Sequence, residues 1–181
     1  MKFLLTGGPC TGKSSTILQL QSLGYTVVSE VSRSIIEQEQ VKEKPILPWT
    51  NLYVFNELVT AKQKKLEEQI TDEVVFLDRG MHDNLVYCAD GKIAIPPELL
   101  RETQIKRYDH VFLLDRLPLY VIDKERKEDA EKGMRLHAGF EKVYKDAGYT
   151  VTRVPVDSIE NRAQYIIDCV KRIRDKERDN K

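Results

Sequence analysis

Residues 3–14 read FLLTGGPCTGKS, and this stretch decides the fold. Gly7, Gly12, Lys13 and Ser14 match the pattern G-x-x-x-x-G-K-[ST] of a phosphate-binding loop. The apolar run before the loop is typical of a buried strand, and the apolar residues after it have helical spacing. Because a strand before the loop and a helix after it are the context that the pattern requires, the sequence predicts a nucleotide-binding P-loop.

The residue types of this loop suit a phosphate group. Glycines reach positive φ at low cost and let backbone N–H groups turn toward an anion, and the helix that begins near Lys13 adds the positive end of its dipole. We expect Lys13 to contact the β- and γ-phosphates and the Ser14 hydroxyl to bind Mg²⁺. The expected nucleotide-binding residues are Gly7, Gly8, Pro9, Cys10, Thr11, Gly12, Lys13, Ser14 and Ser15.

The composition indicates one domain and excludes several classes of partner. We assign residues 1–175 of the 181 to a single domain and 176–181 to a frayed tail with nothing apolar to bury. Because 29 basic residues balance 29 acidic ones, no global field attracts nucleic acid or an anionic membrane. The three cysteines lack metal-ligand spacing, and we find neither a signal peptide nor a membrane-length apolar run. We therefore expect a cytoplasmic protein, either a monomer or a homodimer.

Five strand-like runs alternate with helical patterns along the chain. Such alternation predicts right-handed crossovers and an α/β fold whose parallel sheet is covered on both faces. We expect helices over about 31–43 and 50–70, one ending near Ala147, and a last one opening at 157–160. Between the first two, Trp49 is expected to anchor its loop to the core, a pocket wall being the alternative. The strand-like runs are Phe3–Thr6, Thr26–Ser29, Val74–Asp78, His110–Asp115 and Thr150–Pro155.

The run VVFLDRG at residues 74–80 is the second informative motif. Its aspartate, Asp78, ends a buried strand, and ligands of open parallel sheets bind beyond that edge. We expect Asp78 to hold Mg²⁺ directly or through water, with helix capping as the alternative. Arg79 offers a planar fork of donors to a phosphate-like oxyanion, unless it forms an ion pair in the site wall.

Three further residues are candidates for contact with a phosphoryl acceptor. Glu30 ends the second predicted strand, where a carboxylate can orient an attacking hydroxyl or accept its proton. Arg33 follows by one turn, and a local ion pair with Glu30 is the alternative. Asp83 is a weaker substrate-contact candidate, because a negative charge near a helix N-terminus is the simpler explanation.

A charged segment at about 116–135 is the candidate lid. P-loop kinases close such an element over the reaction and bring cations to the transferring phosphoryl group. Arg126 is the leading catalytic candidate there, followed by Arg116 and Lys127. Near the last strand, Arg162 either stacks on the nucleotide base or decorates a helix. No role is assigned to His82, His110 or His137, which show neither ligand spacing nor a partnered nucleophile.

These motifs together resemble a known family. The chain is similar to P-loop kinase-like ATP-binding proteins that include the ribosylnicotinamide kinase domain of NadR-type proteins and the insect translocation-defect proteins. The resemblance implies a three-layer P-loop NTPase fold, a five-stranded parallel sheet of order 2-3-1-4-5, a small helical lid and a nucleotide bound with Mg²⁺. It also suggests that Glu30 and Arg33 face the acceptor. The segments that carry it are TGGPCTGKSS, EVSR, FLDRG, the D-x-x-R at Asp123 and GYTVTRVPVDSIENR.

The leading hypothesis is a small-molecule kinase. Lys13, Mg²⁺ and lid arginines would neutralise the γ-phosphoryl group of ATP, with GTP as the alternative donor, while Glu30 orients the hydroxyl of a nucleoside-like or nucleotide-like acceptor. The second hypothesis is a nucleotide-dependent switch, against which the missing N-K-x-D base-reading motif counts. A nucleotide-binding module with decayed chemistry is a third.

Overall fold

A computed structural model of the protein describes residues 1–118 and 130–179. The chain forms one five-stranded sheet of parallel pairs in the order β2-β3-β1-β4-β5. The strands are β1 (Lys2–Thr6), β2 (Thr26–Val28), β3 (Val75–Asp78), β4 (His110–Leu114) and β5 (Val151–Val154). The helices are α1 (Lys13–Ser22), α2 (Val31–Gln40), α3 (Leu52–Glu68), α4 (Met81–Asp90), α5 (Pro97–Thr103), α6 (Ala130–Asp146) and α7 (Ile159–Asp179). This order confirms the expected P-loop NTPase topology.

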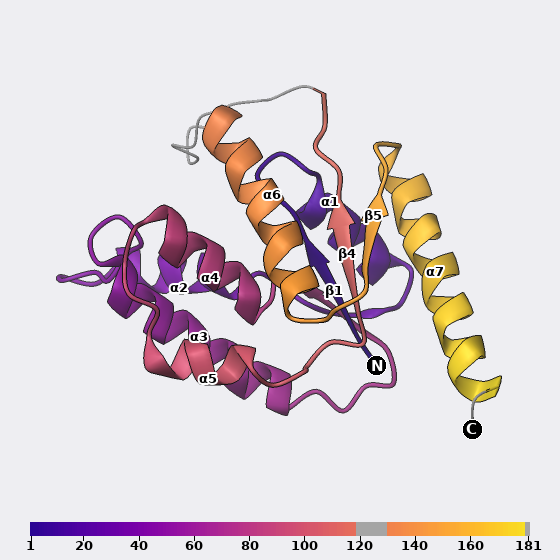
Figure 1. Ribbon diagram of the computed structural model, residues 1–181, viewed down its shortest axis with the longest axis horizontal. Helices are drawn as coiled ribbons and strands as arrows, with labels where there is room; N and C mark the ends of the chain where they lie inside the picture. Colours follow the sequence, from indigo (N-terminus) through magenta and orange to yellow (C-terminus); the bar gives the residue numbers. More distant parts are fainter. Residues whose placement is uncertain (119–129, 180–181) are drawn as a thin grey trace.

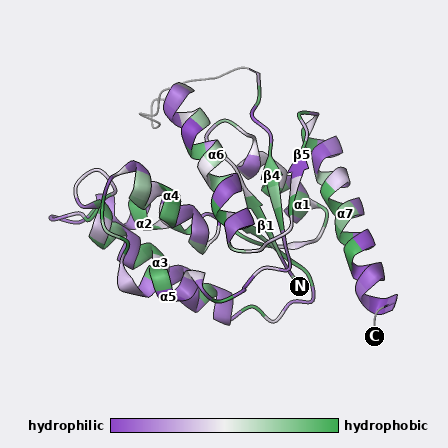
Figure 2. Ribbon diagram, in the orientation of Figure 1, coloured by the Kyte–Doolittle hydropathy of each residue, from purple (hydrophilic) through white to green (hydrophobic). Residues whose placement is uncertain are grey.

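Helices cover the sheet on both faces (Figure 1). Because side chains alternate along a strand, Phe3 and Leu5 of β1 join one core with α1 and α7, whereas Leu4 lies in the opposite core, to which α6 contributes Tyr144. A further apolar cluster joins α2 to α3, and another joins α4 and α6 over Leu113. In Figure 2 the strands are mainly hydrophobic and the helices are amphipathic, as a three-layer arrangement requires.

Three local expectations differ from the structure. The short helix α5 was not predicted, because its seven residues, which begin at the second of two consecutive prolines, are too few to show a helical period. Helix α7 continues to Asp179 instead of fraying from residue 176, since Lys, Glu and Arg are good helix formers even when exposed. Trp49 is 60% exposed and does not anchor its loop, whereas Leu47 is only 5% exposed.

Two other expectations concern the predicted lid and membrane-crossing helices. Of the predicted lid, residues 119–129 lie outside the described part, and α6 begins at Ala130. No helix within residues 1–118 and 130–179 combines the length and the apolar character that crossing a membrane requires.

Replacing a buried residue of the central strand should destabilise the fold. Leu4 is fully buried, so Leu4→Ala is expected to lower the free energy of unfolding by about 2–5 kcal/mol. Leu18→Ala is the matched control, because Leu18 is 62% exposed and the change should stay within about 0.5 kcal/mol. Urea unfolding followed by circular dichroism measures both, and equal effects would contradict this assignment of the core.

Candidate nucleotide and phosphoryl-transfer site

The parallel sheet brings the two sequence motifs together at one edge. In the β1–β3 pair, Leu5 lies opposite Asp78, and the amide of Arg79 donates to the Leu5 carbonyl at 3.0 Å. The phosphate loop therefore leaves the sheet beside the turn that follows Asp78. Glu30 follows β2, the other neighbour of β3, and lies at the same edge.

The carbonyl groups of the phosphate loop are held by other parts of the protein. Lys13 Nζ donates to the carbonyls of Gly7 (2.8 Å) and Gly8 (3.1 Å), and Arg162 Nη1 donates to the Thr11 carbonyl at 2.6 Å. The amide of Leu117 donates to the Cys10 carbonyl at 3.2 Å. By contrast, none of the hydrogen bonds of the described chain has the backbone amide of Gly12, Lys13 or Ser14 as its donor. These amides stand ready for an acceptor from a ligand, as in other phosphate loops.

Lys13 is a buried ammonium group held by the loop itself. Its side chain is only 6% exposed and also lies 3.4 Å from the Thr11 hydroxyl. Burial lowers the pKa of Lys13 to about 8, and the nearby Arg79 guanidinium adds to this shift. Burial is the main cause of the shift, and the carboxylates of Asp78, Glu30 and Asp83 offset it only in part. Phosphate oxygens in direct contact would stabilise the charged form, so Lys13 is suited to move from the loop carbonyls to a bound triphosphate.

Asp78 meets the requirements for a carboxylate that holds a divalent cation. It is 5% exposed, and its Oδ1 has no hydrogen-bond partner within residues 1–118 and 130–179. Burial raises the pKa of Asp78, so the charged form lacks compensation. An unpaired buried carboxylate oxygen beside a phosphate loop fits Mg²⁺, with the half-buried Ser14 in the first turn of α1 as the expected second ligand.

Arg79 and Glu30 form a nearly buried ion pair. Arg79 Nε lies 3.1 Å from Glu30 Oε1, with the two side chains 12% and 19% exposed. The guanidinium lies over the rings of Tyr87 (5.7 Å) and Phe140 (5.3 Å). Arg79 Nη1 is buried and finds no partner in the part of the chain described, so one donor of the fork remains for an oxyanion.

The pairing determines what Glu30 can do chemically. Burial opposes the charge of Glu30, but Arg79 and Lys13 outweigh it, and the Ser32 hydroxyl donates a hydrogen bond at 2.8 Å. Together they lower the pKa of Glu30 to about 2. A carboxylate with so low a pKa is a weak base, so Glu30 is better suited to orient a hydroxyl than to remove its proton early.

The turn after Asp78 is held in an unusual backbone conformation. Arg79 has φ of +70°, which is costly for a residue with a side chain. Its carbonyl accepts a hydrogen bond from Gln63 Nε2 at 3.1 Å, and the amide of Met81 donates to the Tyr108 hydroxyl at 3.0 Å. At Gly80 a Cβ would lie 2.7 Å from the hydroxyl oxygens of both Tyr108 and Tyr144. Gln63 and Tyr108 were not foreseen, because only the folded chain brings α3 and the segment before β4 to this turn.

Asp83 has a capping role instead of an open substrate-contact position. It is 1% exposed, and its carboxylate accepts the Gly80 amide at 2.8 Å and the Thr6 hydroxyl at 2.5 Å. The structure thus places it at the N-terminus of α4, the simpler explanation considered above. Through Thr6, Asp83 also ties the end of β1 to the turn that carries Arg79.

Arg162 does not decorate the surface, so that expectation was wrong, whereas its stacking on a nucleotide base stays a prediction. Its side chain is 3% exposed, and besides Thr11 its guanidinium binds the carbonyls of Asp115 (3.1 Å) and Val154 (3.4 Å). Arg162 thus joins the Thr11 carbonyl of the phosphate loop to the ends of β4 and β5. Its spacing of four from the buried Ile166 was a usable signal for an inward-facing side chain.

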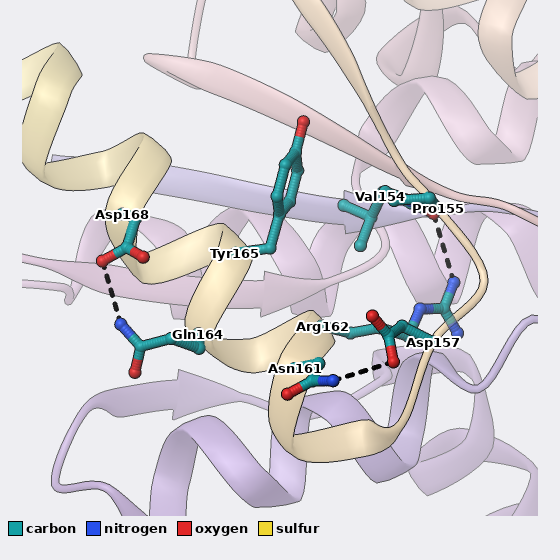
Figure 3. A pocket seen from close by; sticks show the side chains of 8 residues that line it. All are labelled: Val154, Pro155, Asp157, Asn161, Arg162, Gln164, Tyr165 and Asp168. Atoms are coloured by element: carbon teal, nitrogen blue, oxygen red, sulfur yellow. Dashed lines mark hydrogen bonds between the residues drawn. The ribbon is translucent and has the colours of Figure 1, made fainter.

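A cleft of about 290 Å³, lined in part by Arg162, lies between the end of β5 and α7 (Figure 3). Tyr165 and Val154 stand on its walls, and the carboxylate of Asp157 accepts a hydrogen bond from Asn161 Nδ2 at 2.9 Å. Neither Lys13 nor Asp78 lines it. Arg162 lines this cleft and also binds the Thr11 carbonyl, so the cleft adjoins the phosphate loop at Arg162.

The remaining candidates are placed less centrally. Arg33 is exposed on α2, one turn after Glu30, and its side chain makes none of the hydrogen bonds or ion pairs found within the described residues. Arg126 and Lys127 lie outside the described residues, and Arg116 lies between β4 and α6 near Gly133. No group of three metal-ligating side chains occurs within residues 1–118 and 130–179.

A family model for an AAA domain, AAA_28, matches residues 2–162, which include the phosphate loop, Asp78 and Arg162. The chain belongs to this AAA domain family. No match is found among curated proteins.

Solved structures of kinases share the fold of this AAA domain at low sequence identity. The NadR protein in complex with NR has a TM-score of 0.69 and 17% identity, covering 95% of this chain and 51% of its own, so this chain spans about half of that protein. A deoxyadenosine kinase from M. mycoides with the products dCMP and dCDP has a TM-score of 0.62 and 16% identity, over 94% and 99% of the chains. A thymidylate kinase from Ehrlichia chaffeensis has a TM-score of 0.58 and 16% identity, over 94% and 98%. The AAA domain therefore has a P-loop kinase-like fold.

A methyl group at Gly80 should disturb the turn that carries Arg79. The φ of Gly80 is −135°, which any residue adopts, so the cost of Gly80→Ala comes from its contact with the two tyrosine hydroxyls. We expect a loss of about 1–3 kcal/mol in the free energy of unfolding. Gly24→Ala is the control for a methyl group in open space, since its expected cost of about 1 kcal/mol arises from positive φ alone. If Gly80→Ala and the wild type had the same midpoint of urea unfolding, this would contradict the close contact with the two tyrosine hydroxyls.

Nucleotide binding should take up protons in mildly alkaline solution. Because the pKa of Lys13 is about 8 in the free protein and phosphate charges raise it, the charged form binds more tightly. Affinity for MgATP should therefore fall as the pH rises above about 8. Calorimetry near pH 8.5 in buffers of different ionisation enthalpy measures the uptake, at most about one proton. Lys13→Arg, which stays charged, should remove this component, and equal apparent enthalpies in all buffers for the wild type would contradict the lowered pKa.

Proposed function

We propose that this protein is an ATP-dependent small-molecule kinase that transfers the γ-phosphoryl group to a hydroxyl of a nucleoside-like or nucleotide-like acceptor. The observation that carries the proposal is the buried ion pair of Arg79 and Glu30, which lies at the same sheet edge as the phosphate loop and leaves Arg79 Nη1 without a partner in the described chain. A donor site alone would need only the loop and Asp78. The kinases that share the fold are consistent with this class of reaction.

On the donor side, the loop amides bind the phosphates and Lys13 leaves its carbonyl partners to neutralise charge on the γ-phosphoryl group. Mg²⁺, held through Asp78 and the Ser14 hydroxyl, would neutralise charge on the β- and γ-phosphate oxygens. Arg162 keeps the loop in shape by holding the Thr11 carbonyl. GTP stays the alternative donor.

On the acceptor side, Glu30 accepts a hydrogen bond from the attacking hydroxyl. The acceptor oxygen forms a bond to the γ-phosphorus while the bond to the bridging oxygen breaks, and ADP leaves. In a loose transition state the hydroxyl becomes acidic only late, so its proton passes after attack to an oxygen of the transferred phosphoryl group, and the low pKa of Glu30 is no obstacle. Arg79 Nη1 donates to an oxyanion of the substrates, and Arg33 and Arg126 are additional candidates for contact with the acceptor and the phosphoryl group.

The proposal is tested with labelled ATP, Mg²⁺ and a panel of nucleosides, nucleotides and related alcohols. We expect phosphorylation of at least one member. Lys13→Met should lower turnover by at least about 100-fold, because it removes a charge that stabilises the transition state. Glu30→Gln should lower kcat more than it changes the KM for ATP, since Glu30 contacts the acceptor. Lys145→Met, on the exposed face of α6, is the control and should leave turnover unchanged.

Two outcomes would contradict the kinase proposal. One is tight ATP binding without phosphorylated product from any acceptor. The other is acceptor-independent hydrolysis combined with a partner protein that is captured in only one nucleotide state, which would favour a switch. The resemblance to insect translocation-defect proteins stays a prediction.

A further inference from the structure

His137 of α6 makes a direct hydrogen bond to the phosphate loop. The backbone amide of Gly8 donates to His137 Nδ1 at 3.2 Å, across 129 residues of sequence. No sequence pattern marked this histidine as functional. The contact nevertheless joins the helix that follows the charged segment to the second residue of the loop.

The surrounding backbone is shaped for this contact. A Cβ at Gly8 would lie 2.9 Å from the Gly133 carbonyl and 3.1 Å from His137 Cβ, so only glycine fits. A Cβ at Gly133, in turn, would lie 3.2 Å from Pro9 Cγ. Gly133 and His137 are four residues apart and share one face of α6. The helix therefore approaches the loop closely at two successive turns, and the imidazole is the polar group at that approach.

The hydrogen bond requires a neutral imidazole. Nδ1 accepts only when it carries no proton, so the remaining ring proton lies on Nε2. Burial lowers the pKa of His137 from 6.5, and Arg153 and Arg116 also lower it, while Asp115 and Glu141 oppose them. These four side chains, from β5, the end of β4 and α6 itself, are the charged groups that face it. Near neutral pH the acceptor is present.

The contact becomes more important when a nucleotide binds. In the structure the Gly8 carbonyl accepts hydrogen bonds from Lys13 Nζ and from the Thr11 hydroxyl (3.0 Å). If Lys13 turns to a phosphate, Gly8 loses one of these bonds. The bond from the Thr11 hydroxyl stays within the loop, and the bond from the Gly8 amide to His137 then joins this residue to α6.

We propose that His137 is a positioning residue for the nucleotide, whose neutral imidazole holds the Gly8 amide and so fixes the first half of the phosphate loop. The inference rests on the proposed function only in requiring that the loop bind a nucleotide, and it does not depend on which acceptor is phosphorylated. Arg162 and the Leu117 amide hold the second half of the loop, and neither changes charge between pH 5 and 8.

Binding of MgADP, measured by calorimetry between about pH 5.5 and 8, tests this role. His137→Ala removes the acceptor and should weaken binding about fivefold at neutral pH, the usual effect of one hydrogen bond. His137→Asn places an amide oxygen near the position of Nδ1 and should restore most of the affinity. His110→Asn is the control, because His110 is buried and binds the Thr152 hydroxyl, away from the loop.

The pH profile separates this role from a merely structural one. Wild-type affinity should fall as the pH drops below about 6.5 and His137 gains a proton, whereas His137→Asn should lack this component. The titration of MgADP itself is common to all variants and cancels in the comparison. Circular dichroism checks that each variant is folded over the range.

Two results would overturn the inference while leaving the kinase proposal intact. One is unchanged MgADP affinity in folded His137→Ala. The other is the same pH profile for the wild type and His137→Asn. Failure of the wild-type protein to bind MgADP at any pH would instead contradict the proposed function itself, so the two failures are distinguishable.

Discussion

The pairing of β1 with β3 is the interaction on which the site depends. It sets Leu5 opposite Asp78, and the ladder continues for one more bond, from the Arg79 amide to the Leu5 carbonyl. A slip of one residue would turn the side chains of a strand to the opposite face, so the two apolar cores oppose such a change of register. Because the register is fixed, the phosphate loop and the turn after Asp78 leave the sheet side by side.

The site gathers more negative than positive charge, and burial makes this imbalance costly. Lys13 and Arg79 face Glu30, Asp78 and Asp83 at one sheet edge. Arg79 compensates Glu30 directly, whereas burial raises the pKa of both Asp83 and Asp78. Asp83 accepts hydrogen bonds from Thr6, Gly80 and Tyr144, but Asp78 keeps an unpaired oxygen in the described chain. A divalent cation would remove this deficit. The imbalance of the free protein therefore favours the binding of a divalent cation at Asp78.

The sequence predicted the parts of the site that depend on the backbone, and it missed those that depend on distant side chains. The loop pattern and the run before Asp78 report local structure, so both were located and the topology that they imply is confirmed. Arg162 was expected to stack on a base or to decorate a helix, and Asp83 was a weak substrate-contact candidate; in the structure both make hydrogen bonds to the protein itself. His137 was given no role, because nothing local reveals that α6 reaches Gly8. Such contacts depend on how helices far apart in sequence pack on the sheet.

The difference between the two halves of the site explains how distant kinases can share this fold. The donor half consists of backbone amides and carbonyls of the loop, whose geometry any sequence with the right glycines reproduces. The proposed acceptor half would be built from side chains on several elements: Glu30 after β2 and Arg79 after β3, with Tyr87 on α4 and Phe140 on α6 packed against Arg79. Substitutions there alter the pocket without altering the sheet. Selection for a new acceptor therefore acts on residues that contribute little to the topology, and the fold persists at identities near 16%.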